Sequence, residues 1–437
     1  TLIILFYLIY AYATQPLNDS IWFQENPLSL PQWLTEEEKL RLDEIGKAFT
    51  PTNPPAGPVW NIAEFEPMEA VLIRYPLGIS TSLIKEMAED LTVITLVGST
   101  TDESAAKNLY QNAGINMANC QFYIVPTNSY WTRDYGPLWI VDGNDEIGIV
   151  NFPYNRPRPA DDNVPMRLAQ YLGVPLYGMD VVQTGGNYMT DGDGISAGSD
   201  LVYSENSAIS RDELHRRMEN YLGIHSYHVV PDPNNTYIDH IDCWGKFLAP
   251  DKVLIRKVPR SHAQYDEIEE TAAYFAEAVS SYGKPFEVWR VDTPQNQPYT
   301  NSLILNHKVL VPLTNSSYDA AALALYRQAM PGYEVLGFTG SWQSTDALHC
   351  RTKGIADRGM LRIRHIPPFA QPPVKSDSLE LALQINAYSG EGLIADSLRI
   401  WYRTNISHWQ SIPLHFIGND SFYVKLPLQV NGDSLYY

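Results

Sequence analysis

The feature that most constrains the fold is a regular alternation of predicted strands and helices between about residues 60 and 365. The later helices are predicted to begin near Asp162, Arg211, Ala263 and Asp319, each after a strand or hairpin and before another strand. A β-β-α-β order that recurs every ~50 residues indicates a repeat architecture. We therefore expect small sheets repeated about an axis, with a central channel where distant residues meet. A doubly wound sheet is the alternative, but no glycine-rich dinucleotide fingerprint opens a helix here.

Several individual elements are predicted strongly by their periodicity. A helix is expected over 81–90 and another over 101–113, and a hairpin over 302–305 and 308–313. Buried strands are expected over 70–75, 91–97, 121–125, 286–291 and 333–338. These elements define a predicted α/β catalytic region over residues 59–365.

The chain begins with an apolar run, TLIILFYLIYAYA, that carries no charge. Its length and its small-x-small ending predict a signal peptide over 1–13, with cleavage after Ala13 and therefore export; a buried strand or helix is the alternative. Residues 14–58 are predicted to be a lead-in and linker. Within it, Thr35 and Glu38 form a predicted capping box that opens a helix continuing through Leu40, Leu42 and Ile45, before the proline-rich stretch 51–58.

Helical patterns stop after residue 366, where short alternating strands and turns begin. Expected strands over 379–387, 398–403, 412–417 and 421–428 predict an all-β domain over 366–437, most simply an Ig-like sandwich. This domain carries no candidate chemistry, so a structural role is expected.

Charge and cysteine content exclude several function classes. The formal net charge of −19 argues against nucleic acid or an anionic membrane as the main partner and is compatible with cationic substrates. The three cysteines, an odd number, leave at least one free thiol and show no zinc spacing, so neither a metal nor another cofactor is expected.

The candidate nucleophile is Cys350, in a loop that follows a Gly/Ser/Thr-rich approach. A thiol becomes a nucleophile when a base and a lowered pKa support it, although most free cysteines are simply small buried residues. Its strongest candidate partners are His240 and Asp242, which would share one face of a strand, with Cys243 pointing away. A metal pair or a satisfied core histidine are the alternatives for this stretch.

Three more stretches contribute candidate polar groups. In WTRDYGP (131–137), Asp134 is expected at a strand end facing the channel; a local ion pair with Arg133 is the alternative. In NRPRP, Arg156 and Arg158 are expected to project to one side as a clamp for a carboxylate or phosphate, unless they belong to a solvated basic loop. The TGGN stretch (184–187) permits close backbone approach, and Asn301 opens a hairpin.

Together, WTRDYGP, TGGN, HIDCWG and the late His-Cys pair resemble the guanidino-group-modifying enzymes, which include agmatine and arginine deiminases. With NRPRP, the resemblance is strongest to the bacterial secreted peptidylarginine deiminases of the Porphyromonas type, and it covers essentially the whole chain. It implies a five-bladed α/β propeller of ββαβ repeats, the pentein fold, followed by the Ig-like sandwich. It also implies a protein that is secreted or on the bacterial cell surface.

The resemblance further implies a role for each matching residue. Cys350, His240, Asp242 and Asp134 would be catalytic with Asn301, and Arg156 and Arg158 would bind the substrate's terminal carboxylate; Trp131, Tyr237, Ile238 and Thr345 would line the pocket. The expected reaction is metal-independent deimination of arginine at the end of peptides and proteins, with a thiolate–imidazolium pair as the active form. An agmatine deiminase, a binding protein that has lost catalysis and a cysteine protease are the alternatives.

Overall fold

The computed structural model describes residues 29–235, 238–344, 346–367, 378–404, 407–427 and 435–436. The predicted signal peptide and two predicted pocket residues, Tyr237 and Thr345, lie outside these ranges. Within them, no helix combines the length and apolar character that crossing a membrane requires.

The first described element is the short helix α3 (Glu36–Lys39), and its predicted capping box is confirmed. The Glu38 backbone N–H donates to Thr35 Oγ1 (3.2 Å), and the Thr35 N–H donates to Glu38 Oε2 (2.9 Å). The predicted continuation of this helix is wrong: the chain passes through a 3₁₀ turn at Leu42–Glu44, and Leu40 is 85% exposed. The apolar residues of this stretch face no core that would stabilise further helical turns.

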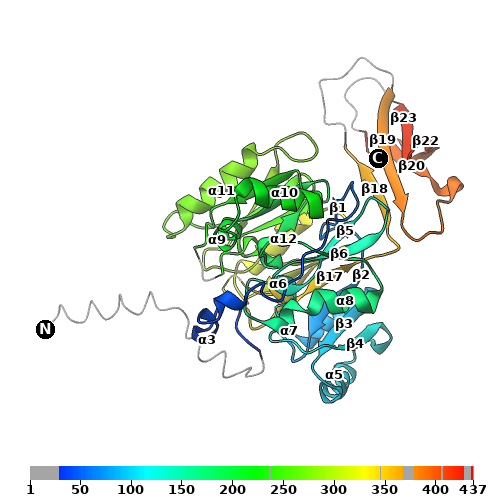
Figure 1. Ribbon diagram of the computed structural model, residues 1–437. Helices are drawn as coiled ribbons and strands as arrows, with labels where there is room; N and C mark the ends of the chain where they lie inside the picture. Colours follow the sequence, from blue (N-terminus) through cyan, green and yellow to red (C-terminus); the bar gives the residue numbers. More distant parts are fainter. Residues whose placement is uncertain are drawn as a thin grey trace.

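The region between residues 60 and 356 contains five separate sheets (Figure 1). The first consists, in spatial order, of β17 (Lys353–Ala356), β2 (Met68–Arg74), β3 (Thr92–Val97) and β4 (Cys120–Ile124). The second consists of β1 (Trp60–Asn61), β5 (Leu138–Val141), β6 (Ile147–Asn151) and β7 (Leu176–Gly178). The third consists of β8 (Met189–Thr190), β9 (Ile195–Ser199) and β10 (Ser226–Val230). The fourth consists of β11 (Gly245–Ala249), β12 (Lys252–Lys257) and β13 (Glu287–Asp292), and the fifth of β14 (Leu303–Leu305), β15 (Lys308–Leu313) and β16 (Glu334–Thr339).

Four of the sheets follow the predicted β-β-α-β order along the chain: an antiparallel pair comes first, and a helical segment then connects its second strand to a parallel third strand. The first sheet has the same spatial arrangement, but its first strand, β17, comes from the end of the region. The helices of these connections are α4 (Thr81–Asp90), α7 (Pro159–Asp162), α8 (Val164–Leu172), α9 (Leu201–Glu205), α10 (Arg211–Leu222), α11 (Tyr265–Glu277) and α12 (Asp319–Ala329). Another helix, α5 (Thr100–Asn112), connects β3 to β4.

Amphipathic helices cover these sheets and form the cores. Helix α4 has Ser80 as its N-cap and buries Leu83, Ile84, Met87 and Ala88. These residues pack in one cluster with the fully buried interior of β2 and β3. A similar apolar stripe in each connection explains why the repeat was readable from sequence periodicity.

Polar loops occupy equivalent positions in all five sheets. The short helix α6 (Thr132–Tyr135) precedes β5, and 3₁₀ turns at Gly185–Asn187, Ile241–Cys243 and His349–Arg351 precede β8, β11 and β17. Asn301 stands in the same place before β14. The candidate residues therefore come from the entrance to the first strand of each antiparallel pair.

The C-terminal strands form two antiparallel sheets that project from the main body (Figure 1). One contains β18 (Leu361–His365), β19 (Ser378–Ala387), β23 (Ser421–Pro427) and β22 (His415–Gly418); the other contains β21 (Gln410–Pro413), β20 (Arg399–Thr404) and β24 (Leu435–Tyr436). A small core with Leu381, Val424 and Leu426 joins them. By strand pairing this unit begins at β18, before the predicted boundary at 366.

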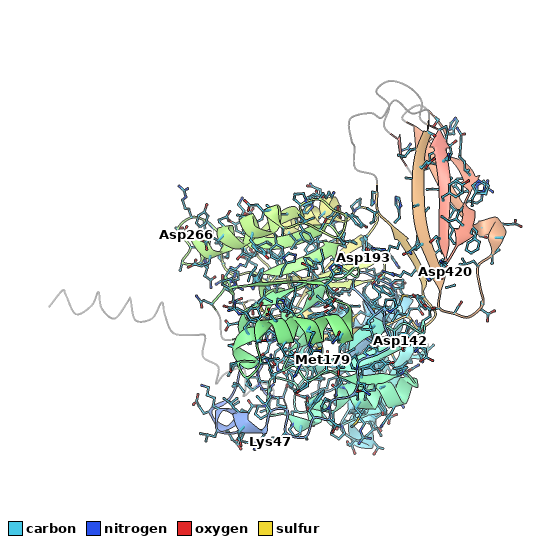
Figure 2. All side chains as sticks on the ribbon, turned by 45° about the horizontal axis from the view of Figure 1, so that its top comes forward. Lys47, Asp142, Met179, Asp193, Asp266 and Asp420 are labelled. Carbon is cyan, nitrogen blue, oxygen red and sulfur yellow. The ribbon has the colours of Figure 1, made fainter. Side chains whose placement is uncertain are left out.

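The C-terminal unit contacts the main body through β18. The Arg362 guanidinium lies 3.4 Å from the centre of the Trp60 ring and donates to Asp193 (3.2 Å), while Arg364 pairs with the same carboxylate (2.6 Å). Figure 2 shows Asp193 on the side of the body that faces these strands. None of these contacts involves a candidate site residue.

Candidate active site

Cys350 is fully buried in the turn before β17, and Asn301 fixes that turn. The Asn301 side-chain oxygen accepts hydrogen bonds from the backbone N–H groups of Ala347 (3.0 Å), His349 (3.0 Å) and Cys350 (3.3 Å). Its amide nitrogen donates to Cys350 Sγ (3.1 Å). One side chain from the fifth sheet therefore positions both the backbone and the sulfur of the candidate nucleophile.

Asp242 lies against the same sulfur, with its Oδ2 atom 3.5 Å from Cys350 Sγ. The predicted strand over this stretch is wrong: Ile241–Cys243 form a 3₁₀ turn, because the chain must bend there before β11 begins at Gly245. The turn also overturns the expected orientation of Cys243. Its sulfur lies 3.6 Å from Asp242 Oδ1, so Cys243 faces the site and does not point away from it.

His240 and Asp134 form the other half of the site. Both are buried, and His240 Nδ1 lies 3.6 Å from Asp134 Oδ1. Among the described residues, neither ring nitrogen of His240 has a hydrogen-bond partner, and Asp134 Oδ1 has none either. Gly186 packs directly over both: a Cβ atom there would lie 2.5 Å from His240 Nδ1 and 2.6 Å from Asp134 Oδ1. The TGGN stretch thus provides the close backbone approach that the sequence predicted.

Asp134 lies in helix α6 rather than at the end of a strand. The alternative ion pair between Arg133 and Asp134 is not formed, because Arg133 pairs with Glu64 (2.9 Å). Two predicted pocket residues, Trp131 and Ile238, are buried, and the Trp131 indole N–H donates to the Leu30 carbonyl (2.9 Å).

The sequence did not predict a charged network behind the thiol. His349 Nδ1 lies 2.7 Å from Asp242 Oδ2, and its Nε2 lies 2.5 Å from Glu64 Oε2. Glu64 also pairs with Lys246 (2.8 Å). A carboxylate only accepts hydrogen bonds, so the imidazole donates to both acids when it is protonated. Burial, together with the charges of Arg133 and Lys246, lowers the pKa of His349, whereas Glu64 and the hydrogen bond to Asp242 act in the opposite direction. Burial alone would raise the pKa of Asp242, but the hydrogen bond and charge of His349 hold that pKa below its usual value.

Asp346 is a second acid that sequence reasoning missed. It is fully buried, Arg351 Nε lies 3.9 Å from its carboxylate, and the Cys350 thiol is close enough to donate a hydrogen bond to it. Burial, together with the charges of Asp134 and Asp242, raises the pKa of Asp346 to about 8. Its position four residues before Cys350, among apolar neighbours, was the available signal.

The electrostatics differ from the expected thiolate–imidazolium pair. Burial raises the pKa of Cys350 well above its usual value, and the charges of Asp242 and Asp346 act in the same direction. Burial also lowers the pKa of His240 to about 3. In the unliganded protein both groups are therefore neutral at neutral pH. Burial and the charge of Asp242 raise the pKa of Asp134 to about 7, although the charges of Arg156 and Arg158 act in the opposite direction.

The predicted clamp residues are buried beside this site, but their guanidinium groups are already bound by residues of the N-terminal part of the chain. Arg158 donates to Glu38 Oε1 (2.6 Å) and Oε2 (3.2 Å), and Arg156 Nε donates to the Gln32 carbonyl (3.0 Å). The Gln32 amide in turn donates to Asp134 Oδ2 (3.0 Å). The alternative of a solvated basic loop is wrong, because Arg156 and Arg158 are 7% and 1% exposed. The prediction treated residues 15–34 as an irregular lead-in and did not anticipate these contacts.

This arrangement is suited to a planar cationic substrate. Two buried carboxylates, Asp134 and Asp242, face a thiol and an imidazole. A guanidinium carries the required charge and several N–H donors in one plane. Among the described residues, no group of three or more His, Cys, Asp or Glu side chains is arranged to hold a metal ion.

Comparisons with known proteins agree with this chemistry. A family model described as Porphyromonas-type peptidyl-arginine deiminase matches residues 62–355, more than half of the chain. An agmatine deiminase from Pseudomonas aeruginosa (strain LESB58) is 22% identical over 284 residues, covering 54% of this chain and 77% of that protein.

Solved structures show the same fold. The agmatine deiminase of Enterococcus faecalis superposes with a TM-score of 0.62 at 18% identity, covering 70% of this chain and 100% of that one. The agmatine deiminase of C. jejuni gives a TM-score of 0.57 at 18% identity, covering 68% and 96%. The α/β region thus has the fold of the pentein deiminases, hydrolases that act on guanidino C–N bonds. The chain belongs to the Porphyromonas-type peptidyl-arginine deiminase family.

Proposed function

We propose that the protein deiminates arginine at the carboxyl end of peptides, forming peptidyl-citrulline and ammonia. The observation that carries this proposal is the convergence of Cys350, Asn301, Asp242, His240 and Asp134 from equivalent loops of different sheets. Two buried arginines lie beside this set, where a carboxylate attached to the substrate would reach them.

Binding of the substrate cation comes first. Asp134 and Asp242 each accept N–H bonds from the guanidinium, which fixes its plane and places a positive charge between the two acids. A cation held between the acids also lowers the pKa of both carboxyls and of the nearby thiol. The neutral thiol of the unliganded protein therefore becomes acidic only when substrate is present.

Covalent chemistry follows in two stages. His240 takes the thiol proton while Cys350 Sγ forms a bond to the guanidinium carbon; His240 then gives that proton to the departing amino group, and the C–N bond breaks to release ammonia. The S-alkylthiouronium that remains is attacked by water, which passes one proton to His240. The C–S bond then breaks, sulfur takes that proton back from His240, the carbon-bound hydroxyl releases its remaining proton to solvent, and the product is the ureido group of citrulline.

Selectivity for a terminal carboxylate would come from Arg156 and Arg158. Arg158 already binds one carboxylate, that of Glu38, through two donors, so its geometry is compatible with that ligand. Agmatine lacks such a group. The relatives named agmatine deiminase nevertheless make agmatine the second candidate substrate, and only a direct comparison separates them.

The test compares four substrates: a peptide ending in arginine, the same peptide as its C-terminal amide, a peptide with internal arginine, and agmatine. Conversion of each guanidino group to a ureido group is followed by the ~1 Da mass gain and by ammonia release. We expect turnover to be fastest on the free carboxylate, and we expect Cys350→Ala to abolish turnover without loss of folding. Faster turnover of agmatine than of the peptides would replace the proposed substrate, and wild-type turnover by Cys350→Ala would refute the mechanism.

The arginine pair can be tested separately with a matched control. Arg156→Ala should lower kcat/KM for the peptide ending in arginine by about 100-fold, the equivalent of ~3 kcal/mol for a charge-assisted contact, and should change agmatine turnover little. Arg167→Ala, an exposed arginine of α8, is the control. Equal losses on both substrates would show that Arg156 does not read the carboxylate.

The finer architecture and the location are also proposals. The five equivalent loops, and the pairing of β17 with β2, support a five-bladed propeller in which each sheet is one blade. The two C-terminal sheets around one core support an Ig-like sandwich. A crystal structure tests both. From the predicted signal peptide we also propose that the protein is exported to the outside or the surface of a bacterial cell. N-terminal sequencing of the exported protein would test this.

A further inference from the structure

The N-terminal segment (residues 29–38) lies across the candidate active site, on the side of α6 and α7 (Figure 1). Gln32 is fully buried, and its amide donates to Asp134 Oδ2 at 3.0 Å. Six residues further on, the Glu38 carboxylate binds Arg158 through both oxygens. One stretch of chain thus offers an N–H donor to a guanidinium-binding acid and a carboxylate to the arginine pair.

Backbone contacts hold the segment in place between these two side chains. Arg158 Nη2 donates to the carbonyls of Pro31 (2.6 Å) and Trp33 (3.2 Å), and Arg156 donates to that of Gln32. At the start of the segment, the Leu30 N–H donates to Asn128 (3.2 Å). These bonds connect an extended peptide to the residues assigned to substrate recognition.

We propose that the N-terminal segment is a built-in pseudosubstrate, which blocks the cleft until it is displaced or cut away. This inference rests on the proposed function, because it interprets Asp134, Arg156 and Arg158 as substrate-binding residues. The segment imitates both ends of an arginine residue: the Gln32 amide stands for the guanidinium, and the Glu38 carboxylate for the terminal carboxylate. A peptide substrate and this segment cannot bind the same side chains at the same time.

The segment is an incomplete ligand, and this explains how a substrate can replace it. The Gln32 amide is neutral, and its own oxygen is buried without a hydrogen-bond partner. It leaves Asp134 Oδ1 and both ring nitrogens of His240 unsatisfied. A guanidinium brings a positive charge and up to five donors, so it forms stronger bonds with the same acids once the segment has left.

A glutamate pair on α3 provides a matched comparison in the full-length chain. Glu38→Gln removes the charge that Arg158 binds, while Glu37→Gln makes the same change at the preceding residue, which is exposed. Gln32→Ala removes the amide at Asp134. We expect Gln32→Ala and Glu38→Gln each to raise kcat/KM for a peptide ending in arginine about tenfold or more, since each loses one charge-assisted contact. Glu37→Gln should behave as wild type.

Alkylation of Cys350 by 2-chloroacetamidine, mapped by mass spectrometry, gives a second readout that needs no turnover. The small amidinium group of this reagent would bind to the same two acids, but the reagent is too short to need the part of the cleft that would hold a peptide. The rate should rise by a similar factor in Gln32→Ala, and melting temperatures would establish that each variant is folded. Faster alkylation without any deimination would support the segment's role and refute the proposed function.

Cleavage of the folded protein completes the test. A protease recognition sequence inserted between Lys47 and Ala48, both exposed, allows the segment to be cut off after folding; Figure 2 shows Lys47 at the outer edge of the body. Activity should rise after the cut. Equal turnover and equal alkylation in the intact, cut, Gln32→Ala and Glu38→Gln proteins would overturn the proposal.

Discussion

Replacement of Asp346 by asparagine should make the stability of the protein less sensitive to pH. The carboxyl group is fully buried, and its pKa is raised from 3.8 to about 8. Asparagine keeps the shape of the side chain but cannot ionise. The comparison between the two proteins therefore isolates the cost of ionising one buried acid.

The sign follows from the direction of the shift. Because the folded-state pKa lies above the unfolded value, the folded protein retains a proton that the unfolded chain releases. The associated stability is fully present below pH 3.8 and is lost progressively as pH rises towards about 8. The loss is about 1.4 kcal/mol per pH unit, so between pH 5 and pH 7 the wild type should lose ~2.5 kcal/mol that Asp346→Asn does not lose.

Thermal unfolding at pH 5, 6 and 7 measures this difference. The Tm of Asp346→Asn relative to wild type should increase with pH, by roughly 3–4 °C over the range. Asp212→Asn, an exposed acid in α10, is the control. Other buried acids with raised pKa values, such as Glu66 and Glu205, affect both proteins equally and cancel. A Tm difference that is the same at all three pH values would refute the burial argument for Asp346.

Three further outcomes follow from the site geometry. Gly186→Ala should lower turnover by about 100-fold or more, because the added carbon would lie 2.5 Å from the His240 ring, whereas Gly245→Ala, with nothing closer than 3.6 Å, should be mild; equal activity of the two variants would contradict the predicted collision. His349→Gln should raise the pKa of Asp242 and move the acid limb of the kcat/KM profile to higher pH, and an unchanged profile would mean that His349 does not tune this acid. The nucleophilic thiol should react much faster with cationic 2-chloroacetamidine than with neutral iodoacetamide at pH 7, and similar rates would argue against substrate-assisted ionisation.

Local patterns in the sequence predicted the repeat well. The helix over Thr81–Asp90 and the hairpin strands β14 and β15 lie where their apolar periodicity indicated, because each buries one face against its own sheet. The set around Cys350 could also be proposed from motifs, since those residues occupy equivalent loops. The strand expected through Asp242 failed, because a short apolar run does not reveal that the chain must turn into the next strand.

The charged network behind the Cys350 thiol could not be predicted from local sequence patterns. Glu64 and His349 are 285 positions apart, and their contact depends on how whole sheets are arranged. Glu64 stands close to Glu66 and Glu69 in the sequence, and nothing in this local pattern distinguishes it from them. Gln32 and Glu38 were harder still, because polar residues in an irregular leader look solvated until the fold shows what covers them.

The pairing of β17 with β2 has a consequence for when chemistry can begin. The last strand of the α/β region returns to the first sheet, and the sulfur stands just before that strand. A growing polypeptide that has emerged only as far as β16 already contains His240, Asp134 and Asp242, but it does not yet contain Cys350. Catalytic competence is therefore acquired in one late event, when the final strand docks beside the earliest one and delivers the thiol.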